Sequence, residues 1–164
     1  MEAGIGMALE GKTVVITGAA GSLGRAVAQA FEAAGANRLL LDIDGDGLAS
    51  AYGGDTDGGL LFTADLADRA SIEAACQAGI EAFKTIDVAC NIAGGFAMGD
   101  PVHETPMDLW QRMMDMNAVS MINTCAAVVP HMLAAGGGKI VNFSSKSGKT
   151  GSALMCHYSS KGDH

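Results

Sequence analysis

Three side chains near the end of the chain have the types and the spacing needed to move a proton at a substrate oxygen. Tyr158 follows Ser145 by 13 residues, and Lys161 comes one helical turn after Tyr158. A free tyrosine, with a pKa of about 10, is a poor base at neutral pH. A nearby ammonium favours the phenolate and lowers that pKa, while a serine hydroxyl on a facing strand can hydrogen-bond a carbonyl or an alcohol. Hydride transfer would then need only a nicotinamide ring at the same edge.

A glycine-rich turn near the start of the chain predicts a site for such a cofactor. Gly18, Gly21 and Gly24 follow the apolar stretch 13–16 and lead into an Ala-rich helical pattern. A strand, a Gly-rich turn and a helix N-terminus together form a cradle of backbone N–H groups for a pyrophosphate. The absent side chains let the backbone turn sharply and approach the ligand.

Two acids close predicted strands and bear on the choice of cofactor. Asp42 comes 18 residues after Gly24, where a carboxylate accepts the ribose hydroxyls of an adenosine and repels a 2′-phosphate. Neither Ile43 nor Asp44 supplies a compensating arginine. The sequence therefore predicts NAD(H) rather than NADP(H), against the alternative of an ordinary strand-end acid. Asp65 is either an adenine contact or a turn acid.

Two asparagines stand out from apolar surroundings. Asn91 ends a predicted strand and is followed by the small residues Ala93, Gly94 and Gly95, which let the backbone lie against a flat cofactor. A structural turn is the competing interpretation, in which Asn91 pins neighbouring strands. Asn117 interrupts a methionine-rich apolar helix, and a buried amide there needs partners. Backbone groups across a helix distortion, or a water in a proton path, would satisfy it.

The elements that must position these groups alternate along the chain. Apolar strands are predicted at 12–17, 38–43, 60–64, 86–91 and 139–143, and helices at 22–35, 47–52, 71–83, 105–135 and from 153 onward. Ser71 and Thr105 are the expected N-caps of their helices. Repeated βα units with short apolar strands predict an α/β fold with a doubly wound, Rossmann-like parallel sheet of about five strands and helices on both faces. One domain is expected over residues 1–164.

Composition excludes several function classes. The formal net charge is −8 without a Lys/Arg cluster, which argues against nucleic acid or an anionic membrane as partner. The four cysteines and four histidines have no metal-ligand spacing, so no metal is expected; the cysteines are predicted to be buried and the histidines to lie at the surface or at helix ends. Residues 1–11 lack a secretory pattern and no apolar run is long enough to span a bilayer. We therefore expect a cytoplasmic protein.

Together these motifs resemble the short-chain dehydrogenase/reductase family, specifically its single-domain branch. The resemblance runs from about Leu9 to Lys161 and is specific as a set, although each motif is weak alone. It implies an NAD-dependent oxidoreductase that interconverts a secondary alcohol and a ketone, and a complete protein that forms a homo-oligomer. By this resemblance Tyr158 is the general acid/base, Ser145 polarises the substrate oxygen, Lys161 holds the ribose and lowers the tyrosine pKa, and Asn117 holds a relay water. The implied cofactor-binding residues are Gly18, Gly21, Ser22, Leu23, Gly24, Asp42, Asp65, Leu66, Asn91, Ala93, Gly94, Tyr158 and Lys161.

The sequence departs from the family pattern in three places. Ser22 replaces a usual glycine, and the resulting glycine spacing resembles the extended branch, which modifies sugar nucleotides as epimerase or dehydratase. Lys161 follows Tyr158 by three residues instead of four, which redirects the ammonium around the helix by about 100°. The chain also stops at His164, where relatives continue, so we expect a C-terminally truncated domain. A non-catalytic dinucleotide-binding remnant or scaffold is the alternative from another class.

Overall fold

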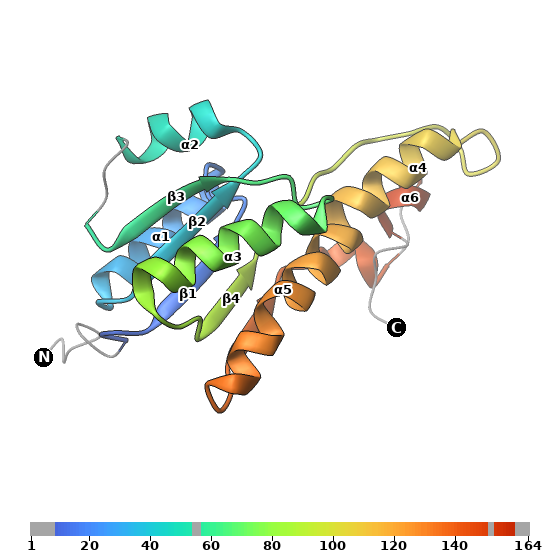
Figure 1. The fold of residues 1–164 in the computed structure, drawn as a ribbon. Helices are drawn as coiled ribbons and strands as arrows, with labels where there is room; N and C mark the ends of the chain where they lie inside the picture. The colour runs from blue at the N-terminus through green and yellow to red at the C-terminus, as the bar shows by residue number, and fades with distance from the viewer. Residues whose placement is uncertain (1–8, 54–56, 151–152, 160–164) are drawn as a thin grey trace, which may run out of the picture.

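A computed structural model describes residues 9–53, 57–150 and 153–159, and these residues form a five-stranded parallel sheet. The strand order is β3-β2-β1-β4-β5, so the chain starts in the middle and winds outward in both directions (Figure 1). The strands are β1 (Thr13–Thr17), β2 (Asn37–Asp42), β3 (Gly59–Thr63), β4 (Val88–Asn91) and β5 (Lys139–Asn142). The predicted doubly wound α/β fold is confirmed.

The helices alternate with these strands as the sequence predicts. They are α1 (Ser22–Ala33), α2 (Gly45–Tyr52), α3 (Arg69–Phe83), α4 (Met107–Met114), α5 (Ser120–Ala134) and α6 (Cys156–Ser159). A π-helical turn, η1 (Asp115–Val119), joins α4 to α5, and a 3₁₀ turn, η2 (Lys146–Gly148), follows β5. The predicted helix over 105–135 is thus one helical rod that begins at Met107 and contains a π turn.

Two apolar layers hold the sheet between helices. On one face, Leu39 and Ala89 pack with Ile72 of α3 and Val128 of α5, all of them fully buried. On the other face, Ile16 packs with Ala28 of α1 and Leu48 of α2. Figure 1 shows α3 and α5 in front of the strands and α1 behind them. Because both faces of the central strands are covered, these strands are continuous apolar runs instead of alternating ones.

Two helix caps differ from the expectation. Asp68, not Ser71, is the N-cap of α3, since its carboxylate accepts from Ala70 N at 3.0 Å. The Ser71 hydroxyl accepts from Asp65 N instead, at 3.1 Å. Pro106 is the N-cap residue of α4, and the Thr105 hydroxyl bonds carbonyls of the preceding loop. Because α3 begins at Arg69, before Ser71, and α4 begins at Met107, after Pro106, neither Ser71 nor Thr105 occupies the N-cap position.

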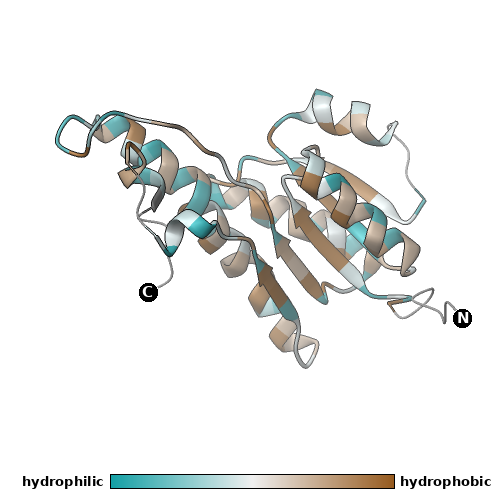
Figure 2. Cartoon of the chain, turned by 180° about the vertical axis from the view of Figure 1, so that it is seen from behind, coloured by the Kyte–Doolittle hydropathy of each residue, from teal (hydrophilic) through white to brown (hydrophobic). Residues whose placement is uncertain are grey.

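The edge strand β5 is the most open part of the sheet. Its residues Ile140 and Val141 are exposed, as is Phe143 beyond it. Figure 2 shows this apolar strand from behind, on the side where α1 covers the neighbouring strands. Among the described residues β5 pairs with β4 alone. The outer edge of β5 is therefore an exposed apolar edge in the described part of the chain.

Candidate functional site

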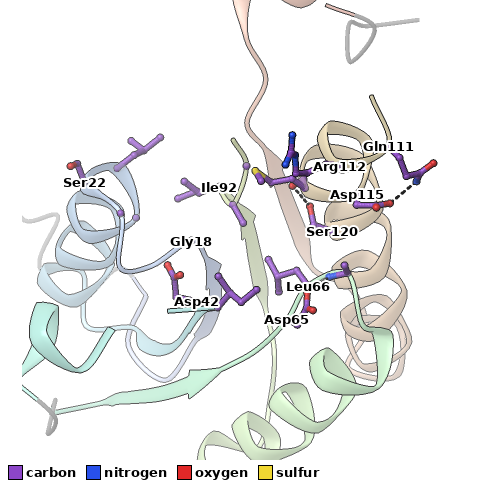
Figure 3. A pocket seen from close by; sticks show the side chains of 18 of the residues that line it. Gly18, Ser22, Asp42, Asp65, Leu66, Ile92, Gln111, Arg112, Asp115 and Ser120 are labelled. Atoms are coloured by element: carbon purple, nitrogen blue, oxygen red, sulfur yellow. Dashed lines mark hydrogen bonds between the residues drawn. The ribbon is translucent and has the colours of Figure 1, made fainter. Parts of the chain in front are cut away.

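A large cavity opens at the carboxyl edge of the sheet, between the first glycine turn and the helix α4 (Figure 3). Its volume is about 780 Å³, which is ample for a nucleotide-sized ligand. Ten of the predicted cofactor-binding residues line it: Gly18, Gly21, Ser22, Leu23, Gly24, Asp42, Asp65, Leu66, Ala93 and Gly94. The fold thus gathers residues from three βα junctions, after β1, β2 and β3, and from the end of β4.

The glycine turn is shaped by contacts that leave no room for side chains. Gly18 has a φ of +67°, and a Cβ atom on it would lie 2.9 Å from Ala93 Cα. A Cβ atom on Gly24 would lie 2.2 Å from the Gly18 carbonyl oxygen. The turn therefore packs directly on the end of β4 while α1 packs directly on the turn. Gly21, the N-cap residue of α1, has no side chain to cap the first-turn amides.

A tyrosine of α2 is hydrogen-bonded to this glycine turn. The Tyr52 hydroxyl donates to the Ala19 carbonyl at 2.9 Å. Burial raises the pKa of Tyr52, with Arg38 and Arg25 acting in the opposite direction. The phenol therefore stays protonated at neutral pH and keeps its role as a donor.

Asp42 lies at the cavity wall with its carboxylate fixed by backbone amides. One oxygen accepts from Ala20 N at 2.9 Å and the other from Asp44 N at 3.1 Å. These two bonds tie the end of β2 to the glycine turn and set the orientation of the carboxylate. Each oxygen retains acceptor capacity, because a carboxylate offers about four lone-pair sites.

The part of the cavity wall that follows β3 is also fixed by hydrogen bonds. The Asp65 carboxylate accepts from Ala67 N at 2.9 Å, and the Leu66 carbonyl accepts from the Asn123 amide at 3.1 Å. Asn123 lies on α5, so the loop after β3 is fastened to the helix that covers this face of the sheet. Leu66 is buried and contributes an apolar surface to the cavity.

Thr17 connects the glycine turn to β4, a function that our sequence analysis did not assign to it. Its hydroxyl accepts from Ile92 N at 3.1 Å and from Ala93 N at 3.0 Å. It lies 3.5 Å from the Cys90 carbonyl, to which it donates. The signal available for this role was a polar residue, Thr17, at the last position of an apolar strand, and the structure shows that it is fully buried there.

Asn91 lies behind the cavity and does not line it. Its side-chain amide donates to the Asn142 side-chain oxygen at 2.7 Å, so it links β4 to β5. This geometry matches the structural interpretation of Asn91, in which it pins neighbouring strands. Its effect on a cofactor would pass through the backbone of Ala93 and Gly94, which do face the cavity.

The opposite wall comes from one face of α4 and η1, which sequence reasoning missed. Asp108, Gln111, Arg112 and Asp115 recur at helical spacing along this face. Gln111 donates to Asp115 at 2.8 Å, and Figure 3 shows both across the cavity from the glycine turn. Among the described residues that line the cavity, Arg112 is the one cation. The 3.6-residue period of these polar side chains was the signal available in the sequence.

Asn117 is buried inside the π turn and brackets Gly95. Its amide oxygen accepts from Gly95 N at 3.1 Å and its amide nitrogen donates to Gly95 O at 3.0 Å. The same nitrogen donates to the Met113 carbonyl at 2.9 Å, across the distorted part of the helix. The expectation that backbone groups across a helix distortion satisfy Asn117 is confirmed.

Ser145 and Tyr158 lie on neighbouring elements beyond the cavity. Ser145 is the N-cap of η2, where its hydroxyl accepts from Ser147 N at 3.2 Å. Tyr158 is carried by α6, which packs against η2 and α4. Its ring meets Phe96 edge to face, with 5.0 Å between the ring centroids. Lys161 lies outside the described residues.

The residues of the cavity fit a dinucleotide such as NAD. The glycine turn leaves backbone exposed where a Cβ atom would block it, and the N-terminus of α1 carries partial positive charge without an acidic residue in its first turn. Asp42 offers acceptors for vicinal hydroxyls, and Leu66 offers an apolar surface for a base.

Comparisons with known proteins match this geometry. The sequence model of the family described as short chain dehydrogenase matches residues 12–162. D-threitol dehydrogenase of Mycolicibacterium smegmatis is 37% identical over 141 residues, which cover 84% of this chain and 54% of that protein. Galactitol 2-dehydrogenase of Agrobacterium fabrum is 35% identical over 153 residues, which cover 93% of this chain and 59% of that protein.

A solved structure extends the likeness to three dimensions. The crystal structure of an NAD+-bound xylitol dehydrogenase superposes with a TM-score of 0.88 at 25% sequence identity, covering 94% of this chain and 60% of the other. The chain thus spans little more than half the length of the curated relatives it matches.

The described residues contain no group of three or more His, Cys, Asp or Glu side chains placed to hold a metal ion. In this part of the chain, no helix is both long enough and apolar enough to cross a bilayer.

Proposed function

This chain belongs to the short-chain dehydrogenase family, and we propose that it serves as an NAD(H)-dependent oxidoreductase that interconverts a secondary alcohol and a ketone. The observation that carries the proposal is the cavity that Gly18, Asp42 and Ala93 build at one edge of the sheet. Its fixed carboxylate favours the two ribose hydroxyls of NAD and repels the 2′-phosphate of NADP. The NAD+-bound neighbour of the same fold supports this choice.

We assign the chemical roles as the family resemblance implies. Tyr158 takes the proton of the alcohol during oxidation and returns it during reduction. Ser145 donates a hydrogen bond to the substrate oxygen, and Lys161 holds the ribose of the cofactor. Bound NAD supplies the hydride acceptor. Asn117 supports the site by fixing Gly95 through both of its backbone polar groups, and we propose that it also orders a relay water.

The test is turnover followed at the absorbance band of reduced nicotinamide. The purified protein is supplied with NAD and a panel of secondary alcohols that includes D-threitol, galactitol and xylitol, the sugar alcohols named for its relatives. Tyr158→Phe should abolish turnover and leave NADH binding within about twofold, because it removes the acid/base group alone. Normal turnover by this variant would show that the acid/base assignment is wrong.

The same preparation distinguishes the alternatives. A non-catalytic binding protein would bind NADH saturably and turn over no alcohol in a broad panel. A sugar-nucleotide epimerase or dehydratase would retain NAD through purification and act on a nucleotide sugar.

We also propose that the protein is cytoplasmic and forms a homo-oligomer. The four cysteines are free thiols in the structure, which suits the reducing cytoplasm. The exposed apolar residues of α4 and α5, Met107 and Ile122 among them, suit a homo-oligomer. Analytical ultracentrifugation of the purified protein measures that oligomeric state directly.

A further inference from the structure

His157 is buried next to Tyr158, although the sequence placed it at the surface or at a helix end. Its exposed fraction is 1%, and its Nε2 atom lies 2.9 Å from the Ala97 carbonyl oxygen. A carbonyl oxygen only accepts hydrogen bonds, so Nε2 carries the hydrogen and donates it. His157 does lie in a helical turn, in α6, but its burial was not expected; it arises because the loop before α4 packs over the ring.

The loop that receives this hydrogen bond contacts α6 at two residues and the segment just before α6 at a third. The Phe96 and Tyr158 rings meet edge to face, Ala97 accepts from His157, and Gly99 N donates to the Leu154 carbonyl at 2.9 Å. A Cβ atom on Gly99 would lie 2.6 Å from His157 Cε1, so the imidazole fills the space that this glycine leaves. We call residues 95–99 the clasp segment.

The clasp segment is also fixed at its other end. Asn117 holds both backbone groups of Gly95, and the preceding residues Ala93 and Gly94 line the cavity. The segment therefore connects the proposed cofactor cavity to the tyrosine, and it is held at Gly95 by Asn117 and at Phe96, Ala97 and Gly99 by residues 154–158.

The helix that carries Tyr158 is held against this loop by its contacts. Within the described residues α6 covers Cys156–Ser159. It packs against α4 and η2, and His157 is its buried contact with the clasp segment.

We propose that His157 is a positioning residue, which holds the Tyr158 phenol in place through its hydrogen bond to Ala97 O. The inference rests on the proposed function, because the phenol must be the acid/base for its position to matter. An error of about 1 Å in the place of a reacting group can lower a rate about 100-fold. Loss of the hydrogen bond should therefore slow the chemical step without weakening the binding of the cofactor.

The experiment compares His157→Leu with His157→Gln in the protein that turns over an alcohol from the panel above. Gln places an amide N–H close to the position of Nε2 and should keep kcat within about threefold of wild type, whereas Leu should lower kcat about 10- to 100-fold. The KM of the alcohol and the Kd of NADH should change by less than about twofold in both variants, since a positioning residue contacts neither ligand. His103→Leu is the matched control, because that ring is exposed.

Two results would overturn the proposal. One is a His157→Leu enzyme with the kcat of wild type, and the other is a fall in kcat that Gln does not reverse. Amide exchange at Gly99 gives a readout independent of turnover, since its hydrogen bond to Leu154 should open more often in His157→Leu than in His157→Gln. A wild-type protein that turns over no alcohol would show that the proposed function is wrong. In that case, equal amide exchange at Gly99 in the two variants would show that His157 does not hold the clasp segment either.

Discussion

At the scale of single residues, the shape of the site depends on glycines, which have no Cβ atom. Gly18 combines a φ of +67° with the close approach of Ala93, whereas Gly53 has a φ of +72° and no atom within 4 Å of a built Cβ in the described part of the chain. A non-glycine residue would therefore be strained by the positive φ at both positions, but only at Gly18 would its Cβ atom also collide with a described neighbour.

We expect Gly18→Ala to destabilise the protein more than Gly53→Ala does. Both variants lose about 1 kcal/mol or more for a non-glycine residue at positive φ, and Gly18→Ala must also displace the end of β4. Urea unfolding measures the stabilities, and fluorescence titration with NADH should show weaker binding for Gly18→Ala alone. Equal losses in the two variants would mean that the Gly18–Ala93 contact does not shape the cavity.

At the scale of elements, Thr17 joins β1 to the loop that leaves β4. Because its hydroxyl is the acceptor for two amides, Ile92 N and Ala93 N, Thr17→Val leaves both without that partner. Ile92 N keeps its hydrogen bond to the Cys90 carbonyl at 3.1 Å, so the expected cost of about 1–3 kcal/mol comes mainly from the Ala93 amide, together with a weaker NADH affinity.

The isosteric Val replacement keeps the shape of the side chain, and Thr17→Ser keeps the hydroxyl. We therefore expect Thr17→Ser to retain most of the stability in thermal melts and most of the NADH affinity. A Thr17→Val protein as stable as Thr17→Ser would show that these amides find other partners.

The elements were predictable from the sequence to different degrees. The strands follow from apolar runs bounded by glycine and aspartate, and the glycine turn and Asp42 follow from their spacing after such runs. The sequence indicated a helix distortion at Asn117 but not that it is a π turn, because helical periodicity alone does not show where one extra residue enters a turn. The polar face of α4 is readable from its helical spacing, but its place at the cavity, like the burial of His157, depends on how the 95–106 loop crosses the sheet edge, and local sequence does not encode that path.

At the scale of the whole molecule, an ion pair at the start of β1 links stability to pH. Lys12 Nζ lies 2.8 Å from Asp87 Oδ1, and Thr13 N donates to Oδ2 at 3.0 Å. Burial raises the pKa of Asp87, but the hydrogen bonds from Lys12 and Thr13 and the charge of Lys12 outweigh it and hold that pKa below its ordinary value of 3.8. The carboxylate joins the amino ends of β1 and β4.

The sign of the pH dependence follows from this lowered pKa. The contribution of Asp87 to stability is complete above pH 3.8, the ordinary value of the unfolded chain, and is lost as the pH falls through the lower folded value. Asp87→Asn should lower the free energy of unfolding by about 0.5–1 kcal/mol at pH 6 and by less at pH 3, because Lys12 is mostly exposed. Urea unfolding of wild type, Asp87→Asn and the exposed control Asp100→Asn at both pH values measures the difference. A constant difference between wild type and Asp87→Asn would contradict the linkage.

The central claim is that the glycine turn and Asp42 build a site for NAD in preference to NADP. The most direct test is calorimetric titration of the purified protein and of Asp42→Asn with NADH and with NADPH. Wild type should bind NADH saturably at one site per chain and NADPH about 10-fold or more weakly, and Asp42→Asn should lose most of that difference, since one charge-assisted contact contributes about 1.5–3 kcal/mol. Absence of saturable NADH binding, or a wild type that binds NADPH as tightly as NADH, would contradict the account.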